Sequence, residues 1–486
     1  METKIGGGAD EEEDMEGAQG IGVTTAAAAR TSKSAFCLFF VFGSSCWVAV
    51  NFVFAEVPLL VVQSFPAVGN FLTVLVVCCI QAANLAPLCI VLASILRHKC
   101  SQESDEKQQL LLNSEKNDSV ATTTTNTTTL WRRSIPVLLV LLLNVGCCAA
   151  LAVTPQPMSL ALFAGLCTLA GLAATTSSVV LLPFGSLYPP VYTAAIAAGN
   201  TSSALAAGVL SLVQQPGAHP RLSFAAFMGV ATALASAALA AFLVLVATPR
   251  YRALALLSQP QPTDRRRGQR IFPARAARVV AVCATRLFLQ GFAENGLAMG
   301  VSAAALLPFG ARCFVAATAG SFVAGPLASL LPSLLHARTA ARTLDSPPCV
   351  AAGTALYLAA AAYMALVAVH CRTGCTTGAA AVVVARVLVR VLTQLGGVRA
   401  WTALHGGGRY GPAIPPALRP HAARLGGLAL QLGGLAGSIT ALLVWHPSSV
   451  SSSSSLLQTL RDHPLWSSPP FLPFLPSSHS PFFPAL

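Results

Sequence analysis

Long apolar runs separated by short polar segments dominate the chain from about residue 35 to residue 445. A run of about 20 apolar residues matches a helix that crosses the hydrocarbon core of a bilayer. The pattern therefore predicts an all-α polytopic membrane protein with eleven transmembrane helices. Their expected bounds are 35–63, 68–96, 134–153, 159–182, 190–214, 222–247, 277–302, 312–334, 348–370, 377–397 and 421–445.

Polar segments flank and divide this apolar region. Residues 1–34 contain the acidic run "ADEEEDMEG" and no short apolar core with a cleavage site, so we expect a disordered cytoplasmic N-terminus and no signal peptide. The Ser- and Pro-rich tail, 446–486, is also predicted to be disordered. A basic cytoplasmic loop, 248–276, separates a six-helix bundle (35–247) from a five-helix bundle (277–445). Such a six-plus-five division is common in secondary carriers, whose halves move about a site near the midplane.

Composition supports a membrane protein. The 486 residues are 54% hydrophobic and only 10% charged, with a mean hydropathy of +0.66, whereas a soluble domain carries about 25% charged residues. The formal net charge is +13. In so hydrophobic a chain, basic residues mark cytoplasmic loops, and we expect no nucleic-acid partner.

The distribution of basic residues predicts the orientation. With the N-terminus inside, 22 of the 30 Lys and Arg residues fall in inner segments and four fall in outer segments. The N-terminus is therefore expected in the cytoplasm and the C-terminus outside. Possible glycosylation tripeptides at Asn117 and Asn126 disagree, because they lie in an inner loop. Such tripeptides arise by chance in Ser- and Thr-rich segments, so we follow the charges.

The 14 cysteines lie mostly inside apolar runs, where a cysteine behaves as a small buried hydrophobe. Cys371 and Cys375 flank an expected outer loop, "HCRTGC". Whether they form a disulfide stays open.

Polar side chains inside the predicted helices are the candidates for function, because an ionisable group in lipid is costly. The only carboxylates there are Glu56 and Glu294. The arginines and amides are Arg286, Arg386, Arg390, Arg424, Asn51, Asn84, Asn144, Gln290, Asn295, Gln394 and Gln431.

Three of the arginines have different expected roles. Arg386 and Arg390 are one helical turn apart and share a face, so they either line a water-filled cavity or pair with a carboxylate. Arg424 is near a helix end and is expected to extend to the headgroups.

The sequence Glu294-Asn295-Gly296 predicts a loosened stretch of helix. Glycine weakens a helix, and an asparagine side chain offers both a donor and an acceptor. This chemistry is typical of the discontinuous helices that bind solutes in carriers.

The first helix contains "WVAVNFVFAEVP", from position 47. Trp47 and Asn51 are one turn apart and share a face near the expected midplane. Glu56 lies about 30 Å from the inner end of an ideal helix, near the outer interface, so its carboxylate either reaches outside water or faces a cavity. Pro58 would clash with the carbonyl group of Phe54, and Glu56 turns towards a cavity only if the helix is kinked or unwound there.

Enzyme motifs are incomplete. "HGGG" at 405–408 occurs in esterases, but the chain has no G-x-S-x-G. Gly406, Gly408 and Gly411 fit G-x-G-x-x-G, yet no strand precedes them and Pro412 follows. No Walker A sequence and no zinc-ligand spacing occurs. We expect no enzyme activity, cofactor or metal.

"SCWVAVNFVFAEVPLLV" resembles the first helix of the eukaryotic riboflavin transporters, with the pattern W-x-x-x-N-x-x-x-x-E-x-P. Trp47, Asn51, Glu56 and Pro58 fit that pattern. Similar segments follow in family order over about 44–440. They are "TSSVVLLPF" (176–184), "GNTSSAL" (199–205), "NGLAMGVSAAALLPFG" (295–310), "ALHGGGR" (403–409) and "ALQLGG" (429–434).

Several positions depart from the family pattern along the expected substrate path, which leaves the specificity open. Glu294 stands where the family has Thr or a similar residue. The other departures are Phe52 for Gly, Ser178 for Asn, Met299 for Pro, Ser302 for Gln and Gly325 for Asn.

The resemblance implies an eleven-span carrier, similar to equilibrative nucleoside transporters and other major-facilitator-like carriers. Such a protein moves riboflavin across the plasma membrane without sodium, and in some members external protons stimulate uptake. Two alternatives stay open: a carrier for another flat heterocycle or nucleoside, and a non-transporting membrane receptor. The oligomeric state is also open.

Riboflavin has a flat ring system, an imide edge and a polyol tail, and carries no net charge. Trp47 is expected to stack on the ring, while amides pair with imide or ribityl groups. The predicted substrate-binding residues are Trp47, Asn51, Asn84, Ser177, Asn295 and Gln431. Glu56 and Glu294 are the predicted proton-coupling or gate residues, because a proton that binds two conformations unequally shifts their balance.

Overall fold

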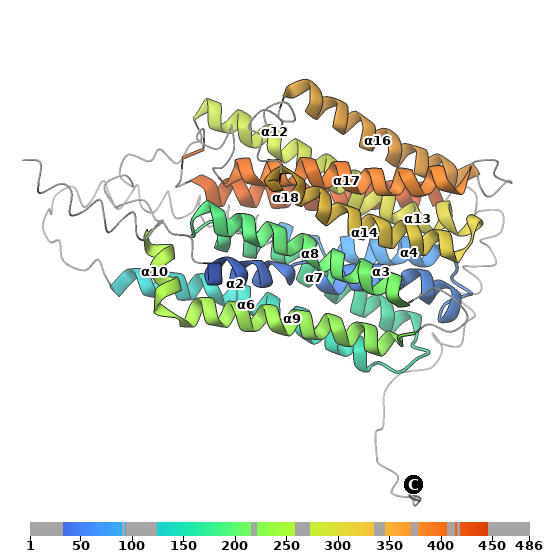
Figure 1. Cartoon of the computed structure of the whole chain (residues 1–486), viewed down its shortest axis with the longest axis horizontal. Coiled ribbons are helices and arrows are strands. Elements are labelled where there is room, and N and C mark those ends of the chain that lie inside the picture. The colour runs from blue at the N-terminus through green and yellow to red at the C-terminus, as the bar shows by residue number, and fades with distance from the viewer. Residues whose placement is uncertain are drawn as a thin grey trace, which may run out of the picture.

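The computed structural model describes residues 33–89, 93, 124–214, 221–257, 273–334, 346–370, 378–405, 414–415 and 418–445, and every regular element within them is helical. Ten helices are long and apolar enough to cross a membrane, or up to eleven if the bent first pair is one span. The helices run side by side along the long axis of the molecule (Figure 1). The prediction of an all-α membrane protein is confirmed.

The helices differ from their expected bounds mainly at the ends. α6 begins earlier than expected and α17 ends later. A short helix, α10, occupies the start of the expected basic loop. The bounds are α2 (Lys33–Ser44), α3 (Val48–Gln63), α4 (Phe71–Ala82), α6 (Thr124–Val153), α7 (Leu160–Gly185), α8 (Pro190–Gln214), α9 (Phe224–Ala247), α10 (Pro249–Leu257), α12 (Ala274–Gln290), η1 (Gly291–Ala298), α13 (Met299–Leu306), η2 (Leu307–Phe309), α14 (Ala311–Leu334), α16 (Pro347–His370), α17 (Ala379–Leu404) and α18 (Arg419–Trp445).

The first expected helix is broken in two. α2 and α3 meet at an angle of 52° across Ser45–Trp47. Pro58 lies inside α3, which continues to Gln63. The break expected near Pro58 is therefore found earlier in the chain, next to Trp47.

Side chains of neighbouring helices stabilise this break. Asn144 of α6 donates to the carbonyl oxygen of Ser45, and Ser177 Oγ of α7 donates to that of Cys46 at 3.2 Å. Backbone groups inside a bilayer must find partners within the protein, since no water is available there. The break thus occurs where two other helices can satisfy the carbonyl groups that it frees.

The second irregular element is η1, a π-helix between α12 and α13. It contains Glu294, Asn295 and Gly296, as the prediction of a loosened helix requires. It packs closely on α18 because glycines face one another there. A Cβ on Gly291 would lie 2.0 Å from the carbonyl oxygen of Leu430, and one on Gly437 would lie 2.2 Å from that of Phe292.

Contacts between helices bring distant parts of the chain together. In the first part of the chain (α2 to α9), α2 packs on α8 and α9, α6 packs on α7 and α9, and α4 packs on α7. In the later part (α12 to α18), α18 packs on α12 and η1, and α17 packs on α14 and α16. The two parts meet through α8 with α14, α7 with α18 and α4 with α13. Their division into six-helix and five-helix bundles stays a prediction.

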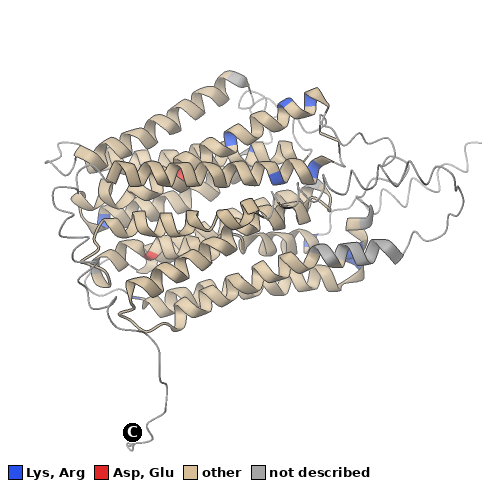
Figure 2. Ribbon diagram, turned by 180° about the vertical axis from the view of Figure 1, so that it is seen from behind, with Lys and Arg blue, Asp and Glu red and all other residues tan. Residues whose placement is uncertain are grey.

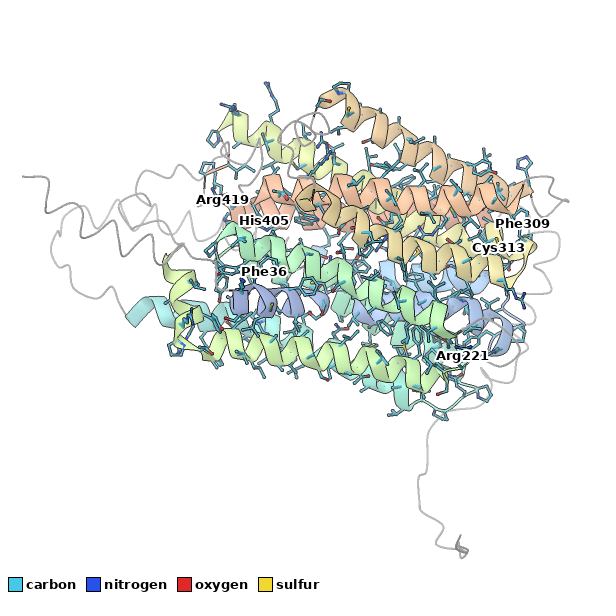
Figure 3. All side chains as sticks on the ribbon, in the orientation of Figure 1. Phe36, Arg221, Phe309, Cys313, His405 and Arg419 are labelled. Carbon is cyan, nitrogen blue, oxygen red and sulfur yellow. The ribbon has the colours of Figure 1, made fainter. Side chains whose placement is uncertain are left out.

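Charge is unevenly distributed along the molecule. Most described Lys and Arg residues lie at the end where α10 is found and α12 begins, whereas the two described carboxylates lie within the helices (Figure 2). His405 and Arg419 lie at that basic end, and Arg221 and Cys313 lie at the other (Figure 3).

We expect Gly433→Ala to destabilise the protein, because the new methyl group would overlap the carbonyl oxygen of Phe288. The overlap is with backbone, so only a movement of α12 or α18 could relieve it. Gly165→Ala on α7 is the matched control, since nothing lies within 4 Å of its Cβ position and alanine favours a helix by about 1 kcal/mol. Thermal unfolding of the purified variants in detergent measures both effects. Equal midpoints for Gly433→Ala and the parent would contradict the close packing.

Candidate binding site

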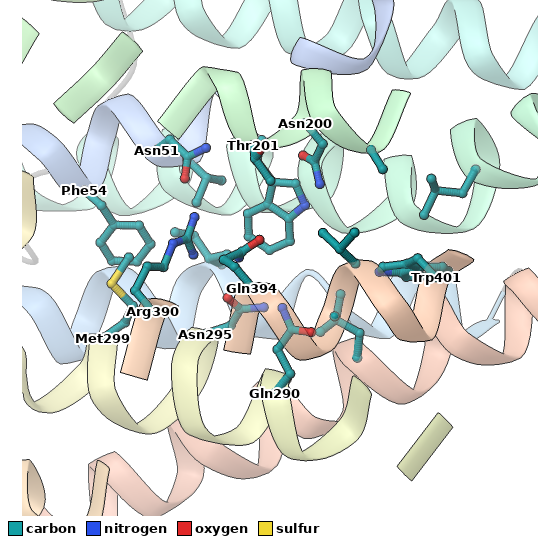
Figure 4. A pocket seen from close by; sticks show the side chains of 18 of the residues that line it. Asn51, Phe54, Asn200, Thr201, Gln290, Asn295, Met299, Arg390, Gln394 and Trp401 are labelled. Atoms are coloured by element: carbon teal, nitrogen blue, oxygen red, sulfur yellow. The ribbon is translucent and has the colours of Figure 1, made fainter. Parts of the chain in front are cut away.

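A pocket lies between the two parts of the chain (Figure 4). It is lined by residues of α3, α4, α7 and α8 and by residues of α12, η1, α13, α17 and α18. The aromatic lining residues are Trp47, Phe54 and Trp401. The polar lining residues are Asn51, Gln81, Asn200, Thr201, Gln290, Asn295, Arg390 and Gln394. An apolar pocket with a few placed polar groups is the usual form of a small-molecule site.

The break before α3 places Trp47 and Asn51 in this pocket. Asn51 Nδ2 donates to Ser203 Oγ at 2.9 Å, and Ser203 Oγ donates to the carbonyl oxygen of Asn200 at 3.0 Å. These bonds fix the amide of Asn51. No described residue donates to its side-chain oxygen, which is left to accept from a ligand.

Two further amides of the lining offer free acceptors. Asn200 Oδ1 and Gln290 Oε1 are buried and have no hydrogen-bond partner among the described residues. A buried polar atom without a partner is costly unless a ligand or water satisfies it. Together with Asn51, they give the pocket three side-chain oxygens that can accept from N–H or O–H donors.

Asn295 enters the pocket from η1. In Figure 4 its side chain lies beside those of Gln290 and Gln394. Gln81 Nε2 of α4 donates to its backbone oxygen at 3.4 Å, so this link joins the two parts of the chain. π-helical turns often occur at functional sites because they turn side chains out of α-helical register.

An ion pair lies at one end of the pocket. Arg390 of α17 pairs with Glu294, which is fully buried. Thr393 Oγ1 also donates to Glu294, and Gln394 Nε2 donates to it at 3.4 Å. The guanidinium of Arg390 lies 5.7 Å from the centre of the Phe322 ring. Both expectations for Arg390 hold, since it pairs with a carboxylate and lines the pocket.

Three residues expected to bind substrate lie between helices, outside the pocket lining. Ser177 Oγ donates to the carbonyl oxygen of Cys46 at the break between α2 and α3. Asn84 Nδ2 donates to Gln81 Oε1 and to the backbone oxygen of Gln431 at 3.1 Å. Gln431 Nε2 donates to Ser178 Oγ at 2.8 Å. They hold pocket-lining elements in place, and their direct contact with a substrate stays a prediction.

Glu56 also lies outside the pocket lining, on another face of α3. It is 2% exposed and does not reach water. Its neighbour is Gln214 of α8, and its Oε1 accepts no hydrogen bond from the described residues. The carboxyl group is thus enclosed beside Gln214, the last residue of α8.

Sequence reasoning did not select several lining residues, namely Gln81, Asn200, Thr201 and Trp401. Gln81 and Trp401 are single polar or amphipathic residues in apolar runs, and Asn200 and Thr201 belong to a short polar stretch. Neither signal tells which helix face meets the pocket. For Gln290 and Gln394 the sequence predicts amides within helices and does not assign them to a binding site.

Other sequence expectations lie outside the described residues. They concern Cys371, Cys375, Asn117 and the glycines 406–408. Asn126 falls within α6, but its side chain is not described. Within the described ranges, no group of His, Cys, Asp or Glu side chains is placed to hold a metal ion.

We expect Glu294→Gln to lower the free energy of unfolding by about 3 kcal/mol, because it leaves the charge of Arg390 buried and unpaired. Adding Arg390→Met to Glu294→Gln should restore much of the loss, since neither charge then remains. Arg286→Met is the control, as Arg286 is half-buried on α12 and has no ion pair among the described residues. Unfolding in mixed detergent micelles measures these three variants and Arg390→Met alone, which completes the double-mutant cycle. Additive losses in the double variant would contradict a coupled pair.

Comparison with known proteins finds a similarity over the first part of the chain. Residues 31–223 match the family model described as solute carrier family 52, riboflavin transporter. This confirms the resemblance over α2 to α8, which include Trp47, Asn51 and Asn200 of the pocket. No curated protein matches the chain.

Proposed function

We propose that this chain is a riboflavin transporter and binds its substrate in the pocket described above, a proposal that starts from the match of residues 31–223 to the riboflavin transporter family. The observation that carries it is the position of Trp47 and Asn51. These residues of the matched segment line a pocket completed by amides from the later part of the chain.

The chemistry of the pocket fits a neutral flavin. Aromatic side chains can stack on the flat ring system. The free oxygens of Asn51, Asn200 and Gln290 can accept from the imide N–H and the ribityl hydroxyls. The single carboxylate near the pocket is already paired with Arg390, so an uncharged substrate leaves this pair undisturbed.

The position of the pocket between the two parts of the chain supports a role in transport. Segments of both parts of the chain line it, so movement of one part against the other would open it to one side of the membrane at a time. Substrate that binds two such states unequally shifts their balance. We therefore propose alternating access.

We also propose that the protein lies in the plasma membrane with its N-terminus in the cytoplasm. The support is the collection of described Lys and Arg residues at one end of the helices, which is typical of the cytoplasmic side. The C-terminal tail then lies outside.

A carrier for another flat heterocycle, such as a nucleoside, is the second candidate. Met299 and the Glu294–Arg390 pair border the pocket and lie outside the matched segment. Met299 and Glu294 differ from the riboflavin transporter pattern. A substrate with a different ring system could make its contacts there.

Uptake of radiolabelled riboflavin by cells that make the protein tests the function. We expect lumiflavin to compete and uridine not to compete. Asn51→Ala should lower uptake at least tenfold, because it removes a fixed acceptor and the bond to Ser203, together worth about 1.4 kcal/mol or more.

Asn70→Ala is the control for this variant, since Asn70 precedes α4, is half-buried and makes no side-chain cap bond. Surface labelling should show equal amounts of parent and variants. Competition by uridine alone would support the second candidate, and normal uptake by Asn51→Ala would remove Asn51 from the site.

We propose Glu56 as the group through which external protons stimulate uptake. A proton on Glu56 would remove a buried charge and supply a donor for Gln214 Oε1, which has no partner among the described residues. We expect Glu56→Gln to make uptake independent of external pH, because the amide of glutamine does not take up a proton. An acid stimulation equal to that of the parent would contradict this role.

A further inference from the structure

Two arginines of α17 are buried, and only one of them, Arg390, is paired with a carboxylate. Arg386 and Arg390 are one turn apart, and like charges at this spacing repel each other. Glu294 accepts from Arg390, Thr393 and Gln394, and no bond joins it to Arg386. The only other described carboxylate, Glu56, lies against Gln214.

Arg386 has no counter-charge among the described residues. Its side chain is 1% exposed. Nη2 donates to Met299 Sδ at 2.7 Å, and Nη1 is buried with no partner. A thioether sulfur is a weak acceptor, and a guanidinium stays charged in proteins. A buried and uncompensated charge of this kind is among the most costly features that a fold can contain.

We propose that Arg386 holds an anionic group in a small site next to the substrate pocket. An anion would supply the missing counter-charge and accept from Nη1. The geometry of a guanidinium suits phosphate and carboxylate groups, and chloride satisfies the same charge.

Met299 separates this site from the pocket. Its sulfur contacts Arg386, and its side chain lines the pocket beside Phe54 and Arg390 (Figure 4). Methionine is unbranched and changes rotamer easily. A shift of this one side chain would join the two sites.

The anion therefore has two possible sources. It is either a free inorganic ion or an anionic group on the transported solute, such as the phosphate of a flavin phosphate. The second source rests on the proposed function, whereas the presence of the site does not.

Thermal unfolding of the full chain in detergent tests the site without transport. Sodium chloride, inorganic phosphate and riboflavin 5′-phosphate are each added, at equal ionic strength, to the parent and to Arg386→Met in a zwitterionic buffer. We expect at least one to raise the midpoint of the parent by about 2 °C or more, in a saturable way. Arg386→Met should show no such shift, and in the buffer alone it should be at least as stable as the parent because it lacks the uncompensated charge.

Arg278→Met, at an exposed position of α12, should keep the response of the parent. Stabilisation by chloride or inorganic phosphate identifies a free ion as the occupant, and stabilisation by riboflavin 5′-phosphate alone identifies an anionic solute. A parent that responds to none of the three, or a response kept in Arg386→Met, would overturn the proposal. Absence of riboflavin uptake would contradict the carrier function and would leave this binding result unchanged.

Discussion

The hydrogen bonds from Asn144 and Ser177 to the carbonyl groups of Ser45 and Cys46 are the interaction on which the binding site depends. They allow the chain to break between α2 and α3 inside an apolar bundle, where an unpaired carbonyl group would be costly. The break sets the direction of α3 and brings Trp47 and Asn51 to the pocket. Residues far apart in the sequence thus fix the position of the motif that resembles the riboflavin transporters.

The later part of the chain also departs from a regular α-helix inside the apolar bundle. η1 leaves regular α-helical bonding, and glycines of η1 and α18 let the two backbones approach closely. This packing places Asn295 at the pocket and Glu294 against α17. The family match covers residues 31–223, and this region follows it.

The two kinds of polar residue in the bundle have separate roles. The amides that line the pocket keep free acceptors, which suits a neutral ligand with N–H and O–H donors. Among the buried charged residues, Glu294 and Arg390 form an ion pair, and Glu294 is bonded to three side chains of α17. Arg386 is the exception among the described arginines buried in the bundle, because sulfur is its only partner.

The sequence by itself determined the class of protein and the helices, because a run of about 20 apolar residues has few stable arrangements other than a membrane-spanning helix. It also indicated the loosened helix at Glu294–Gly296 and the shared face of Trp47 and Asn51, since both depend on local chemistry and helical spacing. The tertiary structure alone decided where the first helix breaks, because the partners of the freed carbonyl groups come from α6 and α7. It also decided that Glu56, Ser177 and Gln431 lie outside the pocket lining while Gln81 and Asn200 lie within it. In a helix that is apolar on all sides, the sequence does not indicate which face meets lipid, a neighbouring helix or a cavity, and only the packing of the other helices settles that.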